Sequence, residues 1–180
     1  MTRSNEKNLR IIAITPSTRG FGFAVVEGGT LIDWGVKSVK GNKNSQCILK
    51  VEELIAHYHP GVMVLEDHSA KGSRRSPRIR ILGEQIIAIA KKQKITVTLF
   101  SRQQVRKAFF SDGNGTKDAL AEILAKRFPE ELGFRLPAKR RPWMSEAYQM
   151  GIFDAVSLAL MIGERKSSQS VRVDAGESDN

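Results

Sequence analysis

The sequence predicts an α/β fold with one mixed five-stranded sheet, in which three antiparallel strands are followed by two parallel strands and helices cover both faces. Two observations lead to this prediction. Three short strand-like segments come first and are separated only by tight turns, which is typical of an antiparallel meander. Further strand-like segments then alternate with helical ones, which is typical of parallel strands joined by right-handed crossovers. The 180 residues, 41% of them apolar, suffice for one such domain with a buried core.

The strands are expected at residues 10–15, 21–26, 31–36, 62–65 and 95–100. β-Branched residues dominate the first of them, and the turn Glu27-Gly28-Gly29-Thr30 joins the second to the third. The fourth, Val62-Met63-Val64-Leu65, is apolar throughout, which indicates a strand buried on both faces in the parallel part of the sheet. It leads directly into Glu66.

Helices are expected at residues 45–58, around 79–89, and at 101–109, 116–128 and 145–162. Ser101-Arg102-Gln103-Gln104 has the spacing of a capping box, and Thr116 is a suitable N-cap. Residues 69–78 and 129–143 are expected to be loops. A single domain is expected over residues 9–163, and the polar ends, residues 1–8 and 164–180, are expected to be disordered.

The composition excludes several classes of protein. No segment approaches the roughly 18 to 20 apolar residues of a membrane span, and Met1 to Asn8 is polar, so neither a transmembrane helix nor a secretory signal is expected. Cys47 is the one cysteine, which excludes an internal disulfide, and no Cys/His spacing suits a structural zinc site. These observations favour a cytoplasmic protein with no membrane partner.

The net charge of +10 arises from one part of the chain. Between residues 71 and 107, eleven basic residues stand against one acidic residue, Glu84, whereas the rest of the chain holds 18 residues of each sign. The eleven are Lys71, Arg74, Arg75, Arg78, Arg80, Lys91, Lys92, Lys94, Arg102, Arg106 and Lys107. Such clustering is typical of proteins that neutralise the phosphates of nucleic acid. The alternative is a solvated surface that only keeps the protein in solution.

Two acidic residues stand out from the surrounding sequence. Glu66 follows the apolar fourth strand, at the sheet edge where open α/β folds bind ligands. Asp154 interrupts the apolar helix segment 152–162, where an unpaired carboxylate would cost several kcal/mol. Its partner is therefore expected to be a divalent metal, the favoured interpretation, or an Arg or Lys in a structural ion pair.

Four segments together resemble the RuvC-type Holliday junction resolvases of the RNase H-like superfamily. They are the strand and turn of residues 11–22, Val64-Leu65-Glu66, the basic segment 105–107 with Gly113-Asn114-Gly115 and Lys117, and the helix segment 154–159. Together they cover nearly all of residues 10–163, and their order and spacing are more specific than any single segment. The resemblance implies the RNase H-like form of the fold described above, and a role in DNA recombination and repair.

In such enzymes, four acidic side chains hold Mg²⁺ ions that activate water and stabilise the leaving oxygen. The resemblance assigns Glu66 to the acid of the fourth strand and Asp154 to the acid of the last helix, and both are expected metal ligands. Thr15 occupies the position of the first-strand aspartate, and Gly151 stands where a further acid is common. Two of the four expected ligands are therefore missing.

Activity is expected to be lost or strongly reduced, because the Thr15 hydroxyl brings no formal charge to a metal. A deficit of about 3 to 4 kcal/mol in transition-state stabilisation lowers a rate by two to three powers of ten. Asp67, Glu84 and Glu146 are substitute acids, and Glu146, two turns before Asp154 on the expected last helix, is the best placed. Mg²⁺ or Mn²⁺ is the expected cofactor if the protein is active, and none is expected if it is not.

The basic residues suggest how nucleic acid would be held. Cations of the 69–78 loop are expected to flank phosphates presented to Glu66, and Arg19 and residues 139–141 are expected to form the opposite wall. Trp143 is expected either to stack on a base or to anchor its loop on the last helix. The full candidate set for nucleic-acid binding is Arg19, Lys71, Arg74, Arg75, Arg78, Arg80, Arg106, Lys107, Lys117, Lys139, Arg140 and Arg141.

Three functions are compatible with the sequence. The first is a protein that binds nucleic acid, foremost branched DNA, without hydrolysing it. The second is an active metal-dependent, structure-specific endonuclease that uses Glu66, Asp154 and a substitute acid such as Glu146. The third is a scaffold whose basic surface faces an acidic protein. The resemblance also implies a homodimer, since a four-way junction has two symmetric strands, although no residue by itself indicates one.

Overall fold

The computed structural model describes residues 9–173 and the side chains of residues 9–164. Its strands are β1 (Arg10–Pro16), β2 (Gly20–Glu27), β3 (Thr30–Ser38), β4 (Val62–Glu66) and β5 (Thr96–Phe100). Its helices are α1 (Lys43–Tyr58), α2 (Pro77–Lys92), α3 (Arg102–Phe109), α4 (Lys117–Arg127), α5 (Pro129–Leu132), the 3₁₀ helix η1 (Gly133–Arg135) and α6 (Met150–Val173).

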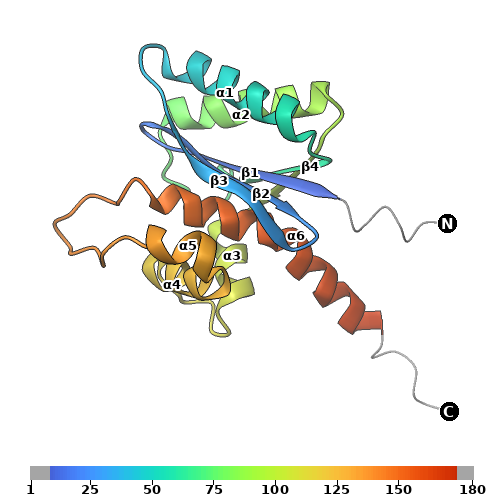
Figure 1. The fold of residues 1–180 in the computed structure, drawn as a ribbon, viewed down its shortest axis with the longest axis vertical. Helices are drawn as coiled ribbons and strands as arrows, with labels where there is room; N and C mark the ends of the chain where they lie inside the picture. The colour runs from blue at the N-terminus through green and yellow to red at the C-terminus, as the bar shows by residue number, and fades with distance from the viewer. Residues whose placement is uncertain (1–8, 174–180) are drawn as a thin grey trace.

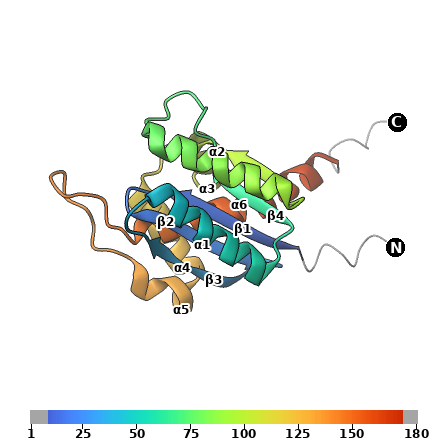
Figure 2. The ribbon, with the colours of Figure 1, turned by 90° about the horizontal axis from the view of Figure 1, so that it is seen from above.

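The strands form one five-stranded sheet in the order β3-β2-β1-β4-β5. β1, β2 and β3 pair antiparallel, whereas β4 pairs parallel with both β1 and β5. The predicted fold class is therefore confirmed. Helices α1 and α2 cover one face of the sheet, and α6 with α3, α4 and α5 covers the other (Figures 1 and 2).

Each face of the sheet has its own core, because successive side chains of a strand point to opposite sides. Ile12 and Ile14 of β1 pack toward α1 and α2 with Leu82 and Ile86. Ile11 and Ala13 belong to the other core, which is dominated by buried residues of α6 and α4. The helix α6 is thus apolar over most of its circumference because it is pressed between the sheet and the outer helices (Figure 1).

Side-chain caps fix where the helices near the carboxyl edge of β4 and β5 begin. Ser76 caps α2, Thr116 caps α4, and Ser101 forms with Gln104 the predicted capping box of α3. α3 begins immediately after β5, so its first residues lie beside the end of β4. These caps therefore determine which side chains face the sheet edge.

Some predicted boundaries were wrong. The segment 129–143, expected to be a loop, contains α5 and η1. Pro129 suits the first turn of α5, and the negative charges of Glu130 and Glu131 interact favourably with the positive N-terminal end of the helix dipole. The last helix begins at Met150 rather than Ser145. The helix also continues to Val173, where the polar composition had suggested disorder from residue 164. Residues 1–8 and 174–180, also expected to be disordered, lie outside the described residues.

The described part of the chain contains no helix that is long and apolar enough to cross a membrane.

β2 and α6 lie in close contact at Gly22. A β-carbon built on Gly22 would overlap the carbonyl oxygen of Gly151 and lie 2.7 Å from Thr15 Oγ1. One built on Gly151 would only reach ordinary contact, at 3.5 Å from Gly22 Cα and from Val36 Cγ1. Gly22 is thus required for the contact between β1, β2 and the first turn of α6.

We predict that Gly22→Ala lowers the free energy of unfolding by about 1 to 3 kcal/mol, because strand and helix backbones must move apart. The matched change Gly151→Ala is expected to leave it unchanged or raise it by up to about 1 kcal/mol, since alanine favours a helix. Urea denaturation of the two variants and the parent measures both effects. Equal stability of the two variants would contradict this account of the contact.

Candidate functional site

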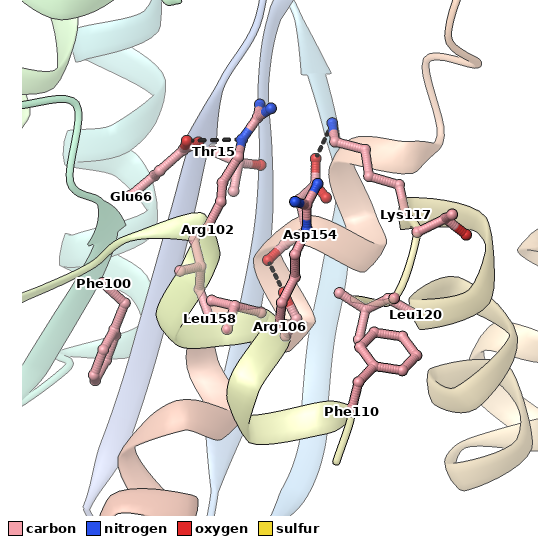
Figure 3. Close-up of a pocket in the computed structure, with 14 residues that line it drawn as sticks. Thr15, Glu66, Phe100, Arg102, Arg106, Phe110, Lys117, Leu120, Asp154 and Leu158 are labelled. Atoms are coloured by element: carbon pink, nitrogen blue, oxygen red, sulfur yellow. Dashed lines mark hydrogen bonds and ion pairs between the residues drawn. The ribbon is translucent and has the colours of Figure 1, made fainter. Parts of the chain in front are cut away.

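The topology brings Thr15, Glu66 and Asp154 to one place. Ala13 pairs with Val64 in the parallel register, so two residues further along Thr15 lies beside Glu66 on the face that α6 covers. Asp154 projects from the first turns of α6 toward the same edge (Figure 3). The three side chains line one pocket, here called the central hollow. Its other lining residues include Phe100, Arg102, Val105, Arg106, Phe110, Lys117, Leu120, Ser157 and Leu158.

Glu66 is held by two arginines. Arg75 Nη2 donates to Glu66 Oε2 at 2.7 Å, and Arg102 Nε donates to Oε1 at 2.9 Å (Figure 3 shows the second pair). The Glu66 side chain is only 11% exposed. Burial acts to raise its pKa, but the guanidinium of Arg75 and then that of Arg102 outweigh burial and lower it. Both carboxylate oxygens of Glu66 therefore already have cationic partners.

Asp154 is held by a lysine. Lys117 Nζ donates to Asp154 Oδ2 at 3.2 Å, and also to both carboxylate oxygens of Glu146, at 2.9 and 3.1 Å. Burial raises the pKa of Asp154, and Lys117 offsets this only in part, since Glu146 raises it further. Of the two partners that the sequence allowed for Asp154, the structure shows the basic side chain.

Glu146 lies near Asp154, but not on the helix that was expected to carry it. It stands in the loop before α6 and is tied to the site through Lys117. The other two substitute acids have different surroundings. Asp67 Oδ1 accepts hydrogen bonds from the backbone and hydroxyl of Ser69, and Glu84 is exposed on α2.

Thr15 is buried, with its hydroxyl 3.0 Å from the carbonyl oxygen of Gly151 and 3.3 Å from that of Gly22. The hydroxyl donates its one hydrogen toward these two acceptors and so ties β1 to β2 and to α6. An aspartate at this position would face two carbonyl oxygens with a negative charge. The surroundings therefore suit a neutral donor rather than a carboxylate.

The residues present do not fit the two metal ions that the resemblance implies. Among the described residues, no group of three or more His, Cys, Asp or Glu side chains is placed to hold a metal ion. Mg²⁺ requires near-octahedral oxygen ligands and several carboxylate charges for a pair of ions. Here Glu66 and Asp154 are each bonded to basic side chains of the protein, and Thr15 contributes no charge.

Several of the predicted binding residues surround the central hollow. Lys71, Arg74 and Arg75 line a second hollow that also contains Glu66, Arg102 and Arg106, here called the basic groove. Arg19 lines a hollow on the other side of Thr15, where its guanidinium lies over the ring of Tyr148. Arg140 and Arg141 line a hollow next to Lys117 and Glu146.

Other basic residues have different roles or positions. Arg78 donates to Asn44 and to the carbonyl oxygen of Ser17, and Arg80 donates to that of Ser73, so these two arginines support neighbouring loops. Lys107 and Lys139 line none of the hollows around the site.

The charged segment of the sequence does not form one surface. α2 starts near the carboxyl edge of β4 and runs back toward the opposite edge. Its last residues, Lys91 and Lys92, and the following Lys94 therefore lie away from Glu66, beside the start of β5. Five other basic residues of the segment line the basic groove, namely Lys71, Arg74, Arg75, Arg102 and Arg106.

Arg102 and Tyr148 were missed as site residues. A usable signal existed for Arg102, since the capping box of residues 101–104 places it at the start of a helix directly after the expected fifth strand. The hydroxyl groups of Tyr148 and Ser38 form a hydrogen bond of 2.7 Å, which holds the loop before α6 against β3. Trp143, in the same loop, is 75% exposed and does not anchor the loop on α6 as one interpretation had expected.

The comparisons with known proteins identify the fold. No family model matches the chain, and no curated protein matches it. Solved structures do match. RuvC from Thermus thermophilus superposes with a TM-score of 0.64 at 17% identity, over 89% of this chain and 97% of that one. The yeast mitochondrial Holliday junction resolvase gives 0.58 at 14% identity, over 84% and 76%. The fowlpox virus Holliday junction resolvase gives 0.55 at 12%, over 87% and 99%.

The chain therefore has an RNase H-like fold. Within that class its mixed sheet and helices match the arrangement found in RuvC-type resolvases, as the resemblance implied.

We predict that Glu66→Gln lowers the free energy of unfolding at pH 7 by about 1 to 2 kcal/mol, because two charge-assisted hydrogen bonds are weakened while Arg102 is half exposed. The folded pKa of Glu66 is lowered, so its contribution is full above the unfolded pKa of about 4.3 and is lost as pH falls through the folded value. Denaturation at several pH values should show parent and variant converging in acid. A difference independent of pH would contradict the ion pairs.

Asp154 should show the opposite sign. Its folded pKa is raised, so its ionised form destabilises the protein above the unfolded pKa of about 3.9, and this penalty disappears as pH falls below that value. Asp154→Asn is therefore expected to raise the melting temperature at pH 7 but not in acid. Glu52→Gln, on the exposed side of α1, removes the same charge and should change little. A lower melting temperature for Asp154→Asn at pH 7 would refute this assignment.

Proposed function

We propose that this protein binds branched DNA through the surface around the central hollow and does not hydrolyse it. The observation that carries the proposal is the state of the two acids. Glu66 and Asp154, the side chains that the resemblance assigns to metal, are neutralised by Arg75, Arg102 and Lys117 of the protein itself.

Loss of hydrolysis follows from the charges required by two-metal chemistry. Two Mg²⁺ ions bring four positive charges and need several carboxylates to hold them. Before any metal could bind, Glu66 would have to release two guanidinium groups and Asp154 its ammonium group. The Thr15 hydroxyl is committed to backbone carbonyl oxygens. The cost of breaking these ion pairs adds to the effect of the missing carboxylate charge, because both oppose metal binding.

DNA binding is supported by the cations that surround the hollow. Lys71, Arg74 and Arg106 border the basic groove, and Arg19 and Arg140 border hollows on the other sides of the site. Exposed guanidinium and ammonium groups spread over a groove are suited to a phosphate backbone. Trp143 adds an exposed aromatic ring with the Arg141 guanidinium 5.5 Å from its centre, which suits stacking on an unpaired base.

Branched DNA is the class of ligand that the structural comparison favours. One of the solved structures of similar fold is T. thermophilus RuvC in complex with a Holliday junction substrate, with a TM-score of 0.63 at 16% identity over 89% of this chain and 96% of that one. A dimer would present two such surfaces to the two symmetric strands of a junction, and we include a homodimer in the proposal on that ground.

A second function, metal-dependent cleavage, is favoured by one observation. Lys117 holds the carboxylates of Glu146 and Asp154 around one ammonium group, so these two acids lie close together. If a divalent ion such as Mg²⁺ or Mn²⁺ displaced Lys117, the two acids could serve it as ligands. The pair is incomplete compared with the four acids that the resemblance implies, and we therefore rank it second.

We predict that the parent protein binds a labelled four-way junction with strongly salt-dependent affinity and leaves it uncut in Mg²⁺ or Mn²⁺. Anisotropy titrations at several salt concentrations and a gel-based cleavage assay measure the two properties. Because Asp at position 15 would face two carbonyl oxygens, Thr15→Asp alone is not expected to create robust cleavage.

The two candidate functions give different results with single variants. Robust cleavage by the parent that is lost in Glu66→Gln, Asp154→Asn and Glu146→Gln would reject the binding function and establish the nuclease. Absence of affinity for both DNA and RNA would reject both and leave the scaffold hypothesis.

A further inference from the structure

We propose that the mouth of the central hollow binds a phosphodiester group of DNA through the protein's own cations, with Arg106 as the main donor and no divalent metal. This inference rests on the proposed function and adds the ligand chemistry of the site. In this site, basic side chains of the protein contact the acids that a metal would need.

Arg106 carries a guanidinium group that has no hydrogen-bond or ion-pair partner among the described residues. It lines both the central hollow and the basic groove, and it rises beside Asp154 at the mouth of the hollow (Figure 3). This sets it apart from Arg75, Arg102 and Lys117, each of which donates to a carboxylate. An exposed guanidinium carries five N–H donors, so Arg106 has its full capacity available for an anion.

Arg102 stands one helical turn before Arg106 on the same face of α3. It uses Nε for Glu66, and within the described part of the chain its two terminal nitrogens donate to no residue. Val105 lies between the two arginines in the sequence, and its buried side chain packs α3 onto the core. α3 therefore presents two guanidinium groups with free donors toward one opening.

Glu66 acts as a positioning residue in this arrangement. Its carboxylate binds Arg75 from the loop before α2 and Arg102 from α3, so it joins two elements across the opening. Arg75 still has an unused donor, because its Nε is buried and has no hydrogen-bond partner within the described part of the chain. The resemblance assigns Glu66 the role of a metal ligand, whereas here its carboxylate orients Arg75 and Arg102.

The charge around the opening favours an anion. Three carboxylates, those of Glu66, Asp154 and Glu146, stand against the four cations Arg75, Arg102, Arg106 and Lys117, which leaves one net positive formal charge. A phosphodiester carries one negative charge and several acceptor oxygens, and guanidinium groups bind it in a planar, forked geometry. The adjoining basic groove, which Lys71 and Arg74 line, extends the cationic surface. A surface of this extent suits successive phosphates of a DNA strand rather than a single small anion.

The test compares Arg106→Ala with Lys107→Ala. Both residues are exposed, lie in the last turn of α3 and carry one positive charge, but only Arg106 lines the hollow. Neither side chain forms an ion pair with a described residue, so we expect the two substitutions to have similar effects on folding, and thermal melting checks this. Affinity for a labelled four-way junction is measured by anisotropy in EDTA and in Mg²⁺ at equal ionic strength.

We expect the parent to bind at least as tightly in EDTA as in Mg²⁺. Arg106→Ala should weaken binding by about tenfold or more, as for loss of hydrogen bonds to a charged group, and Lys107→Ala by no more than about threefold. Weaker binding of the parent in EDTA, or equal effects of the two substitutions, would overturn the inference while the proposed function stands. Absence of junction binding by the parent in both buffers would instead reject the proposed function itself.

Discussion

The ion pairs of Glu66 and Asp154 are the interactions on which the rest of this site depends. Both carboxylates lie where the sheet edge meets α6, a position that removes them from much of the solvent. Buried carboxylates require compensation, and the fold can supply it either with metal ions or with its own cations. This chain uses Arg75, Arg102 and Lys117. That choice determines the charge of the hollow and the kind of ligand it can accept.

The same pairs connect separate parts of the fold. Glu66 joins the loop before α2 to α3, and Lys117 joins the start of α4 to α6 and to the loop before it. Thr15 adds a third connection, between the central strand and the first turn of α6. The residues that the resemblance assigns to metal binding thus connect secondary-structure elements around an opening, and Glu66 contributes both to stability and to the orientation of the binding cations.

Much of this arrangement could be predicted from the sequence. The uninterrupted apolar segment before Glu66 indicated an interior strand, and Asp154 within an apolar helix indicated a buried carboxylate that needs a partner. The resemblance to RuvC-type resolvases then assigned both acids to one site. The identity of their partners could not be predicted, because many basic residues were available and only the capped starts of α2, α3 and α4 select Arg75, Arg102 and Lys117. Lys91 illustrates the same limit. It belongs to the basic cluster in the sequence, but α2 runs away from Glu66 and carries Lys91 to the opposite edge of the sheet.

The central claim is that protein cations, rather than metal ions, neutralise Glu66 and Asp154. Crystals of the protein soaked in Mn²⁺ and measured at the manganese absorption edge test this claim most directly. We predict no anomalous density between the two carboxylates, with Arg102 still bonded to Glu66 and Lys117 still bonded to Asp154. A manganese ion bound by both carboxylates, with these basic side chains displaced, would contradict the account.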